Sequence, residues 1–206
     1  MFLPISISIE SPIIIFGYGS VGMRKASLLV DLGFPVIAFD SVEKDDNLSN
    51  DNLSLIKTFI NSTNFVDFLK RKPPLVIVAL GSNDHLSTEI ANYCKNHGIL
   101  VNVVDKPNIS SVIFSSILKS GDLCISISTQ GTCPFYTKQL RKELDPFVKT
   151  KSKWLHVLAK LRKKSKDPKK ELNRIYENQD FQLMLKSGNF NDALLLGSEM
   201  LISDVK

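Results

Sequence analysis

The chain has 206 residues, of which 43% are hydrophobic and 23% are charged, and its formal net charge is +5. This composition excludes an intrinsically disordered protein, and the length allows one ordinary domain plus a smaller one. The apolar runs are much shorter than the ~20 residues that a bilayer-crossing helix needs, so we expect no membrane segment and no membrane partner.

The N-terminus begins Met1-Phe2-Leu3-Pro4-Ile5, without a basic region or a small-residue cleavage site, so we expect no secretory signal. The cysteines Cys94, Cys124 and Cys133 are widely spaced and form no Cys-x-x-Cys pair. We interpret all three as small buried hydrophobic residues of a reduced, cytoplasmic protein.

The first half of the chain alternates between short apolar runs and segments with helical periodicity. The expected strands lie at residues 12–16, 34–39, 55–59, 75–79 and 99–104, and the expected helices at 20–32, 64–70 and 84–97. This β-α-β alternation predicts an α/β fold with a Rossmann-type parallel sheet and helices on both faces, over residues 1–108.

The pattern changes after Asp105. Two further strands are expected at 112–118 and 123–128, joined by a hairpin-like turn, and helices at about 134–148, 151–165, 168–177 and 190–202. We therefore divide the rest of the chain into a strand-pair and helix region, residues 109–148, and a helical C-terminal domain, residues 149–206.

The excess of positive charge lies in residues 149–170, which hold ten Lys and Arg residues and a single acidic one, Asp167. One interpretation is a solvated helix face, with Trp154 and neighbouring leucines packed inward. The other is an anion-binding surface. Aromatic residues do not alternate with the lysines, so we expect no nucleic acid as a partner.

The loop between the first strand and the first helix reads Gly17-Tyr18-Gly19-Ser20-Val21-Gly22. In a Gly-x-Gly-x-x-Gly loop the first glycine permits a tight turn, the second lets the backbone approach a pyrophosphate, and the third lets helix and strand pack closely. The helix N-terminus then offers free N–H groups to the phosphates. We expect Gly17, Gly19, Ser20, Val21 and Gly22 to bind a dinucleotide; the alternative is a purely structural glycine turn.

Asp40 ends the second expected strand, 18 positions beyond Gly22. An acidic residue near this position binds the ribose hydroxyls of NAD and repels the 2′-phosphate of NADP. We therefore expect NAD as the cofactor. Ser82 follows the strand at 75–79, where open α/β sheets bind ligands, and it is either a further cofactor contact or a helix N-cap.

Several segments resemble the precorrin-2 dehydrogenase family, which forms the NAD-dependent part of siroheme synthase and includes sirohydrochlorin ferrochelatases. They are the glycine loop with the Arg24-Lys25 pair, the stretch Asn102-Val103-Val104-Asp105, the Ser128-Thr129-Gln130-Gly131 turn, and the helix that follows it. The sequence departs from the family pattern at Tyr18, at residues 112–115 and at Cys133, and the similarity is loose after residue 150.

The resemblance implies NAD-dependent oxidation of precorrin-2, a carboxylated tetrapyrrole, to sirohydrochlorin in sirohaem biosynthesis. Some members of the family also insert ferrous iron, so either both activities or the dehydrogenase alone agree with it. A non-catalytic, NAD-binding regulatory module is the alternative from another functional class. We expect no metal bound by the protein's own side chains, because His85, His97 and His156 are scattered.

By motif match, Asp105 is the expected catalytic residue, which takes a proton as the hydride leaves; its alternative role is in a turn. Ser128 is either a substrate contact or a backbone cap in its turn. Asn102 is either a substrate contact or a residue that only holds backbone. The resemblance also implies a homodimer formed through the strand-pair region, whose free edges invite pairing.

Overall fold

The computed structural model describes all residues except 1–9, 43–50, 82, 131 and 204–206. The chain divides into two compact units, residues 1–114 and 115–206. None of the described helices is both long and apolar enough to cross a membrane.

The first unit is built on a parallel sheet of five strands in the order β3-β2-β1-β4-β5. The strands are β1 (Ile13–Phe16), β2 (Val36–Asp40), β3 (Leu53–Lys57), β4 (Leu75–Val78) and β5 (Leu100–Val103). The helices are α1 (Ser20–Asp31), α2 (Phe65–Leu69) and α3 (Asp84–Asn96). The predicted Rossmann-type fold of this region is confirmed, with element ends that differ from the prediction by a few residues.

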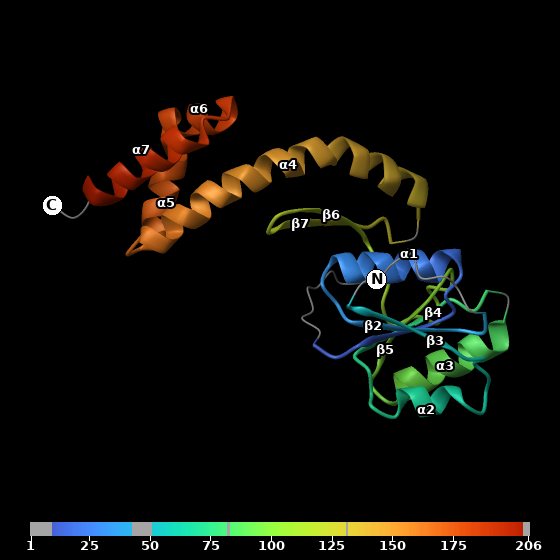
Figure 1. The fold of residues 1–206 in the computed structure, drawn as a ribbon. Coiled ribbons are helices and arrows are strands. Elements are labelled where there is room, and N and C mark those ends of the chain that lie inside the picture. The colour runs from blue at the N-terminus through green and yellow to red at the C-terminus, as the bar shows by residue number, and fades with distance from the viewer. Residues whose placement is uncertain (1–9, 43–50, 82, 131, 204–206) are drawn as a thin grey trace. The chain divides into compact units, whose positions relative to one another are not determined.

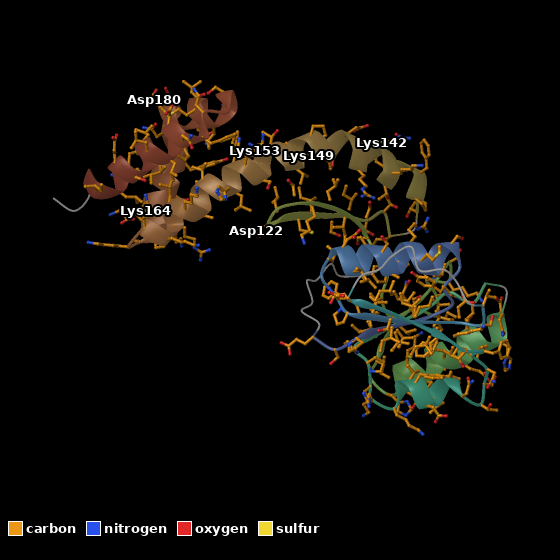
Figure 2. All side chains as sticks on the ribbon, in the orientation of Figure 1. Asp122, Lys142, Lys149, Lys153, Lys164 and Asp180 are labelled. Atoms are coloured by element: carbon orange, nitrogen blue, oxygen red, sulfur yellow. The ribbon has the colours of Figure 1, made fainter. Side chains whose placement is uncertain are left out.

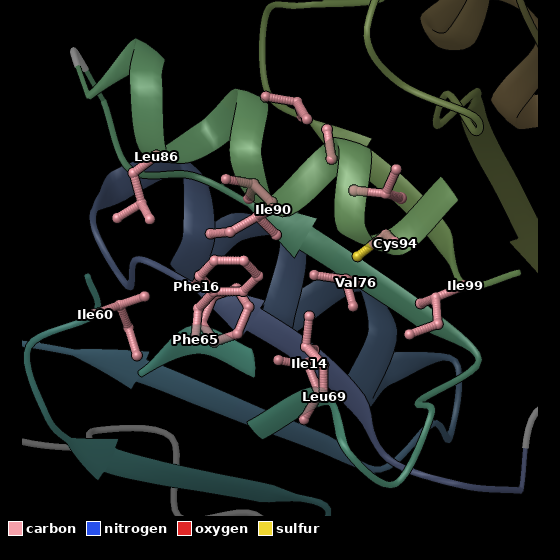
Figure 3. Packing of buried hydrophobic residues seen from close by; sticks show 14 of the residues in the cluster. Ile14, Phe16, Ile60, Phe65, Leu69, Val76, Leu86, Ile90, Cys94 and Ile99 are labelled. Carbon is pink, nitrogen blue, oxygen red and sulfur yellow. The ribbon is translucent and has the colours of Figure 1, made fainter. Parts of the chain in front are cut away.

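Alternation along the strands separates two hydrophobic layers, because successive side chains point to opposite faces of a sheet. Ile13 and Ile15 pack with Leu29 of α1, whereas Ile14 and Phe16 belong to the cluster that contains α2 and α3 residues. Figure 1 shows α1 on one face of the sheet and α2 and α3 on the other. Figure 3 shows the second layer, in which α3 residues cover β1 and β4.

The strand order places the chain reversal between β1 and β4. From β1 the chain moves outward to β2 and β3, and then crosses back to pair β4 with the other side of β1. Loops that follow neighbouring strands diverge at such a point and leave a crevice beyond the carboxyl ends of the strands. The loops after β1, β4 and β5 therefore meet at one edge of the sheet.

The second unit contains an antiparallel strand pair, β6 (Ser116–Ser120) and β7 (Leu123–Ile127), and four helices within the described residues. The helices are α4 (Pro134–Lys164), α5 (Pro168–Glu177), α6 (Gln179–Ser187) and α7 (Phe190–Ser203). Trp154 and Leu161 of α4 pack with residues of α5, α6 and α7 in a separate core. The side chain of Ser152 on α4 donates a hydrogen bond of 2.6 Å to the carbonyl of Ser120 on β6.

Four details of the prediction are wrong. The helices expected at 134–148 and 151–165 form one continuous helix that runs through Pro146, so the expected boundary at 148/149 falls inside α4. Strand β6 starts at Ser116 rather than at residue 112, and α6 was not predicted. Cys94 is buried as expected, but Cys124 and Cys133 are exposed.

Candidate active site

Two glycines of the loop after β1 are required by the close approach of three backbone segments. Gly17 has a φ of +93°, and a Cβ atom there would lie 2.3 Å from the carbonyl oxygen of Ala79. A Cβ atom on Gly22 would lie 2.0 Å from the carbonyl oxygen of Gly17. Any side chain at these positions would therefore force β1, α1 and the end of β4 apart.

Gly19 has a different environment, because a Cβ atom there would meet no protein atom within 4 Å. Gly19 is the N-cap of α1, no side chain caps the helix, and the first turn holds no acidic residue. The N–H groups of the first turn therefore face open space at the positive end of the helix dipole. An anion such as the pyrophosphate of a dinucleotide fits this space, so the residues present agree with the predicted cofactor.

A cavity of about 350 Å³ adjoins this helix end. This volume is at the lower end of the range for small-molecule sites. Its walls come from the start of α1, the ends of β4 and β5 and one residue of α3, and all belong to the first unit. The lining residues are Gly19, Ser20, Val21, Gly22, Val78, Ala79, Leu80, Gly81, Ser87, Val103, Val104, Asp105 and Lys106. The structure therefore brings four of the five predicted loop residues together with Asp105.

Asp40 is held at the end of β2 by backbone donors. Its Oδ2 atom accepts a hydrogen bond of 2.7 Å from the backbone N–H of Tyr18, and its Oδ1 atom accepts one of 3.1 Å from Val42. These bonds tie the carboxylate to the glycine loop. Asp40 is partly buried and does not line the cavity of the described residues.

Asp105 follows β5 and lines the cavity, and its side chain is exposed. Its φ is +59°, in the left-handed region that residues other than glycine seldom adopt. Asp tolerates this region better than most residues because its short side chain bonds locally. The next residue, Lys106, forms an ion pair with Asp84 in the first turn of α3.

Asn102 is buried, and its amide donates a hydrogen bond of 2.9 Å to the carbonyl of Val112. Its side chain thus holds backbone, one of the two roles left open by the sequence, and it does not line the described cavity. Ser128 lies in the second unit, where its Oγ atom accepts a hydrogen bond of 3.0 Å from the N–H of Gln130. Ser82 lies outside the described residues, and the N-cap of α3 is Asn83, which accepts a hydrogen bond from the N–H of Leu86.

Sequence analysis gave no role to three residues in or beside the site. Ser87 and Lys106 line the cavity, and Ser87 is 2% exposed, with its hydroxyl donating to the carbonyl of Asn83 at 2.8 Å. Lys25 lies one helical turn beyond Val21 and Gly22 on α1. Of the three, only Lys25 carried a signal in the sequence, as part of the Arg24-Lys25 pair.

Residues 8–116 match a protein-family profile described as "Putative NAD(P)-binding". The chain is 28% identical over 199 residues to a "Putative precorrin-2 dehydrogenase" of Methanocaldococcus jannaschii, covering 89% of this chain and 94% of the relative. It is 34% identical over 152 residues to a precorrin-2 dehydrogenase of Methanosarcina barkeri, covering 71% and 66% of the two chains.

The chain spans about a third of the siroheme synthases it matches, for example 33% of the one from Methylococcus capsulatus, at 28% identity over 161 residues. Among solved structures it is similar to "SirC, precorrin-2 dehydrogenase", with a TM-score of 0.70, 16% identity, and coverage of 94% of this chain and 98% of that one. At this identity the structural similarity supports the fold, and it extends through both units.

Proposed function

The chain belongs to the precorrin-2 dehydrogenase family, whose NAD(P)-binding region it carries at residues 8–116, and on this premise we propose that it oxidises precorrin-2 to sirohydrochlorin with NAD. One observation supports this most directly: Asp105 and the anion-binding end of α1 line the same cavity. A cofactor site and a carboxylate that can take a proton are therefore adjacent.

The reaction removes a hydride and a proton from the macrocycle. When bound, NAD supplies the hydride acceptor. The N–H groups at Ser20 and Val21 would hold its pyrophosphate, and Asp40 would hold a ribose through its carboxylate. Asp105 takes the proton on a carboxylate oxygen at the cavity rim, as a general base. Ser128 remains a predicted substrate contact.

The experiment follows the absorbance of precorrin-2 mixed with the protein and NAD. With the native protein, we expect the spectrum of the oxidised macrocycle and the absorbance of NADH to develop at the same rate. In Asp105→Asn, NAD binding should survive while turnover falls roughly 10²-fold or more, the scale of lost general base catalysis. Asn also tolerates the left-handed backbone of this position, so loss of the base is separated from loss of the turn.

Native turnover in Asp105→Asn would leave Asp105 as a turn residue only. If NAD binds and no oxidised product forms with the native protein, the regulatory-module alternative is favoured. Iron insertion stays a prediction of the family resemblance. The test adds ferrous iron to the oxidised product with and without the protein. A spectral change that requires the protein would show that the protein inserts the metal.

We further propose a cytoplasmic homodimer that pairs through the strand region of residues 109–128. The sheet formed by β6 and β7 has two strands, and such a sheet is marginal alone and presents edges for pairing. Sedimentation at micromolar concentration should give the mass of a dimer, and a monomer at that concentration would contradict this proposal.

A further inference from the structure

Lys25 lies beside the cavity on the same helix face as two of its lining residues. It follows Val21 by four positions and Gly22 by three, and both line the cavity. Residues at these spacings share one helix face. Long helical side chains also lean toward the helix N-terminus, so that of Lys25 extends back over the turn at the cavity.

The ammonium group of Lys25 rests on an aromatic ring. Its Nζ atom lies 4.1 Å from the centroid of Phe114, which packs against the same core cluster as Val104. A cation over an aromatic face within ~6 Å is attracted to the ring. The side chain is therefore held between α1 and the segment that follows β5, which is the segment that carries Asp105.

The charges around Lys25 come from two elements. The pKa of Lys25 is lowered from 10.5 to about 8, mainly by burial and then by the charge of Arg24 on the same helix, while Asp105 acts in the opposite direction. The carboxylate of Asp105 thus acts on Lys25 across the gap between α1 and the loop after β5. Attraction between opposite charges is mutual, so the ammonium group also acts on Asp105.

We propose that Lys25 is a positioning residue for Asp105: its ammonium group, seated on Phe114, draws the Asp105 carboxylate to the cavity rim, where that carboxylate takes the substrate's proton. This inference rests on the proposed function. It assigns to Lys25 an effect on the proton-transfer step and none on the binding of NAD, because Lys25 itself does not line the described cavity.

The charge on Lys25 gives this role a measurable pH dependence. Because the pKa of Lys25 is lowered to about 8, the ammonium form dominates below pH 8 and the neutral amine dominates above it. The attraction on Asp105 is therefore present at neutral pH and is lost as the pH rises through about 8. We expect kcat for the oxidation of precorrin-2 to fall over this range.

Three variants test the mechanism. Lys25→Met should lower kcat at pH 7 about tenfold, to the level that the native enzyme reaches at high pH, with the KM for NAD unchanged. Lys25→Arg should restore most of kcat and remove the fall above pH 8, because Arg stays charged throughout. Arg24→Gln should keep kcat at pH 7 and move the fall to higher pH, because Arg24 lowers the pKa of Lys25.

A second measurement needs neither substrate nor cofactor. Reductive methylation with ¹³C-formaldehyde labels the lysines, and the Lys25 signal, assigned by its absence in Lys25→Arg, is titrated by NMR. We expect a midpoint near 8, against ~10.4 for an ordinary lysine. The midpoint should rise in Arg24→Gln and fall in Asp105→Asn.

Each result decides the inference or the proposed function. A Lys25 midpoint near 10.4, a midpoint unmoved by Asp105→Asn, or native kcat in Lys25→Met at pH 7 would overturn the positioning role, even in an active enzyme. If the protein does not oxidise precorrin-2, the proposed function fails, and the NMR titration alone still decides whether Lys25 and Asp105 interact. Melting curves and NAD titrations of Lys25→Met exclude misfolding as the cause of lost turnover.

Discussion

Gly19 and Gly22 differ by three positions in one loop, and the structure predicts opposite effects for the same substitution at each. An added Cβ atom meets nothing within 4 Å at Gly19, but it lies 2.0 Å from the carbonyl oxygen of Gly17 at Gly22. Gly19 also has φ −71° and ψ −172°, which alanine adopts without strain. Gly19→Ala should therefore keep the native stability, whereas Gly22→Ala should be destabilised.

For Gly19→Ala, two small effects on the free energy of unfolding oppose each other. Alanine restricts the unfolded chain, which stabilises by about 0.4–1 kcal/mol, but it is a poorer N-cap than glycine, which costs a similar amount. For Gly22→Ala, the overlap with backbone should cost roughly 1–3 kcal/mol, as overpacking does. Since 1 kcal/mol moves the melting temperature of a chain of this size by about 2–4 °C, the first variant should melt near the native temperature and the second several degrees lower.

For NAD affinity the order is reversed, because Gly19→Ala should be the more damaging of the two substitutions. The methyl group of Gly19→Ala occupies the space in front of the N–H groups of α1, so we expect at least a tenfold loss of affinity, about 1.4 kcal/mol, in a fully folded protein. Calorimetric titration with NAD measures the affinity, and circular dichroism without ligand measures the melting temperature. Gly33→Ala is the control: Gly33 has a φ of +89° and lies outside the cavity, so it should lose stability and retain NAD affinity.

Two outcomes would refute this reasoning. Native NAD affinity in Gly19→Ala would mean that the pyrophosphate does not enter the open space before α1. A native melting temperature in Gly22→Ala would mean that β1 and α1 are not packed as closely as the structure has them.

Two further predictions concern the choice of cofactor and the binding of the anionic substrate. Asp40 should make the protein bind NAD more tightly than NADP, and Asp40→Ala should narrow this difference in affinity. Equal affinities of the native protein for the two cofactors in a fluorescence titration would contradict this. Asp40→Asn, which keeps one acceptor for the Tyr18 N–H, serves as the control. Changing the exposed lysines Lys160, Lys163 and Lys164 together to Gln should raise the KM for the anionic tetrapyrrole a few-fold at low salt, leave the KM for NAD unchanged and flatten the salt dependence; an unchanged KM at all salt concentrations would identify these lysines as a solvated face.

The lysine-rich segment shows how the two interpretations of its sequence combine in the structure. Trp154 and Leu161 are buried in the core of the second unit, as the helical-face interpretation required. Lys149 pairs with Asp145, and Lys164 donates a hydrogen bond of 3.1 Å to Ser198. Figure 2 shows labelled lysines spread along the length of α4. One face of α4 thus packs in the core, and the salt experiment tests only what the outward-facing lysines bind.

The glycine loop could be predicted from the sequence because its residues are contiguous and each glycine answers a local requirement of backbone geometry. The role of Lys25 could not, because it depends on Asp105 and Phe114, which lie about 80 and 90 positions away and reach it only in the folded sheet. Sequence motifs fix what a segment can form, while contacts between segments depend on strand order.

The misplaced start of β6 has a similar cause. Residues 112–114 are apolar and resemble a strand, but the N–H of Val112 bonds to the carbonyl of Val101 on β5, and Phe114 packs on the core of the first unit. Ser110 and Ser111 accept hydrogen bonds from Val103 and Val101 along the same edge. An apolar run that covers a sheet edge and a run that forms a strand have the same composition.

Helix α6 was missed although its ends carry recognisable signals. The side chain of Asn178 accepts a hydrogen bond of 2.9 Å from the N–H of Phe181, as an N-cap does, and Gly188 ends the helix with a φ of +84°. The helix has only 9 residues, too few for its apolar periodicity to stand out from the longer helices on either side.

Two features beside the cavity, one after β5 and one on α1, oppose folding, and this supports the proposed placement of the chemistry there. The left-handed backbone of Asp105 costs on the order of 1 kcal/mol, and the burial of Lys25 disfavours its charged form. A turn that served only to connect β5 with the following segment would need neither, since glycine would fit the backbone and a neutral side chain would cover Phe114. Unfavourable conformations and lowered pKa values concentrate at functional sites because the reaction requires them. The glycine loop needs no such strain to hold a dinucleotide, which agrees with the proposal that the start of α1 binds the cofactor and that Asp105, positioned by Lys25, takes the proton.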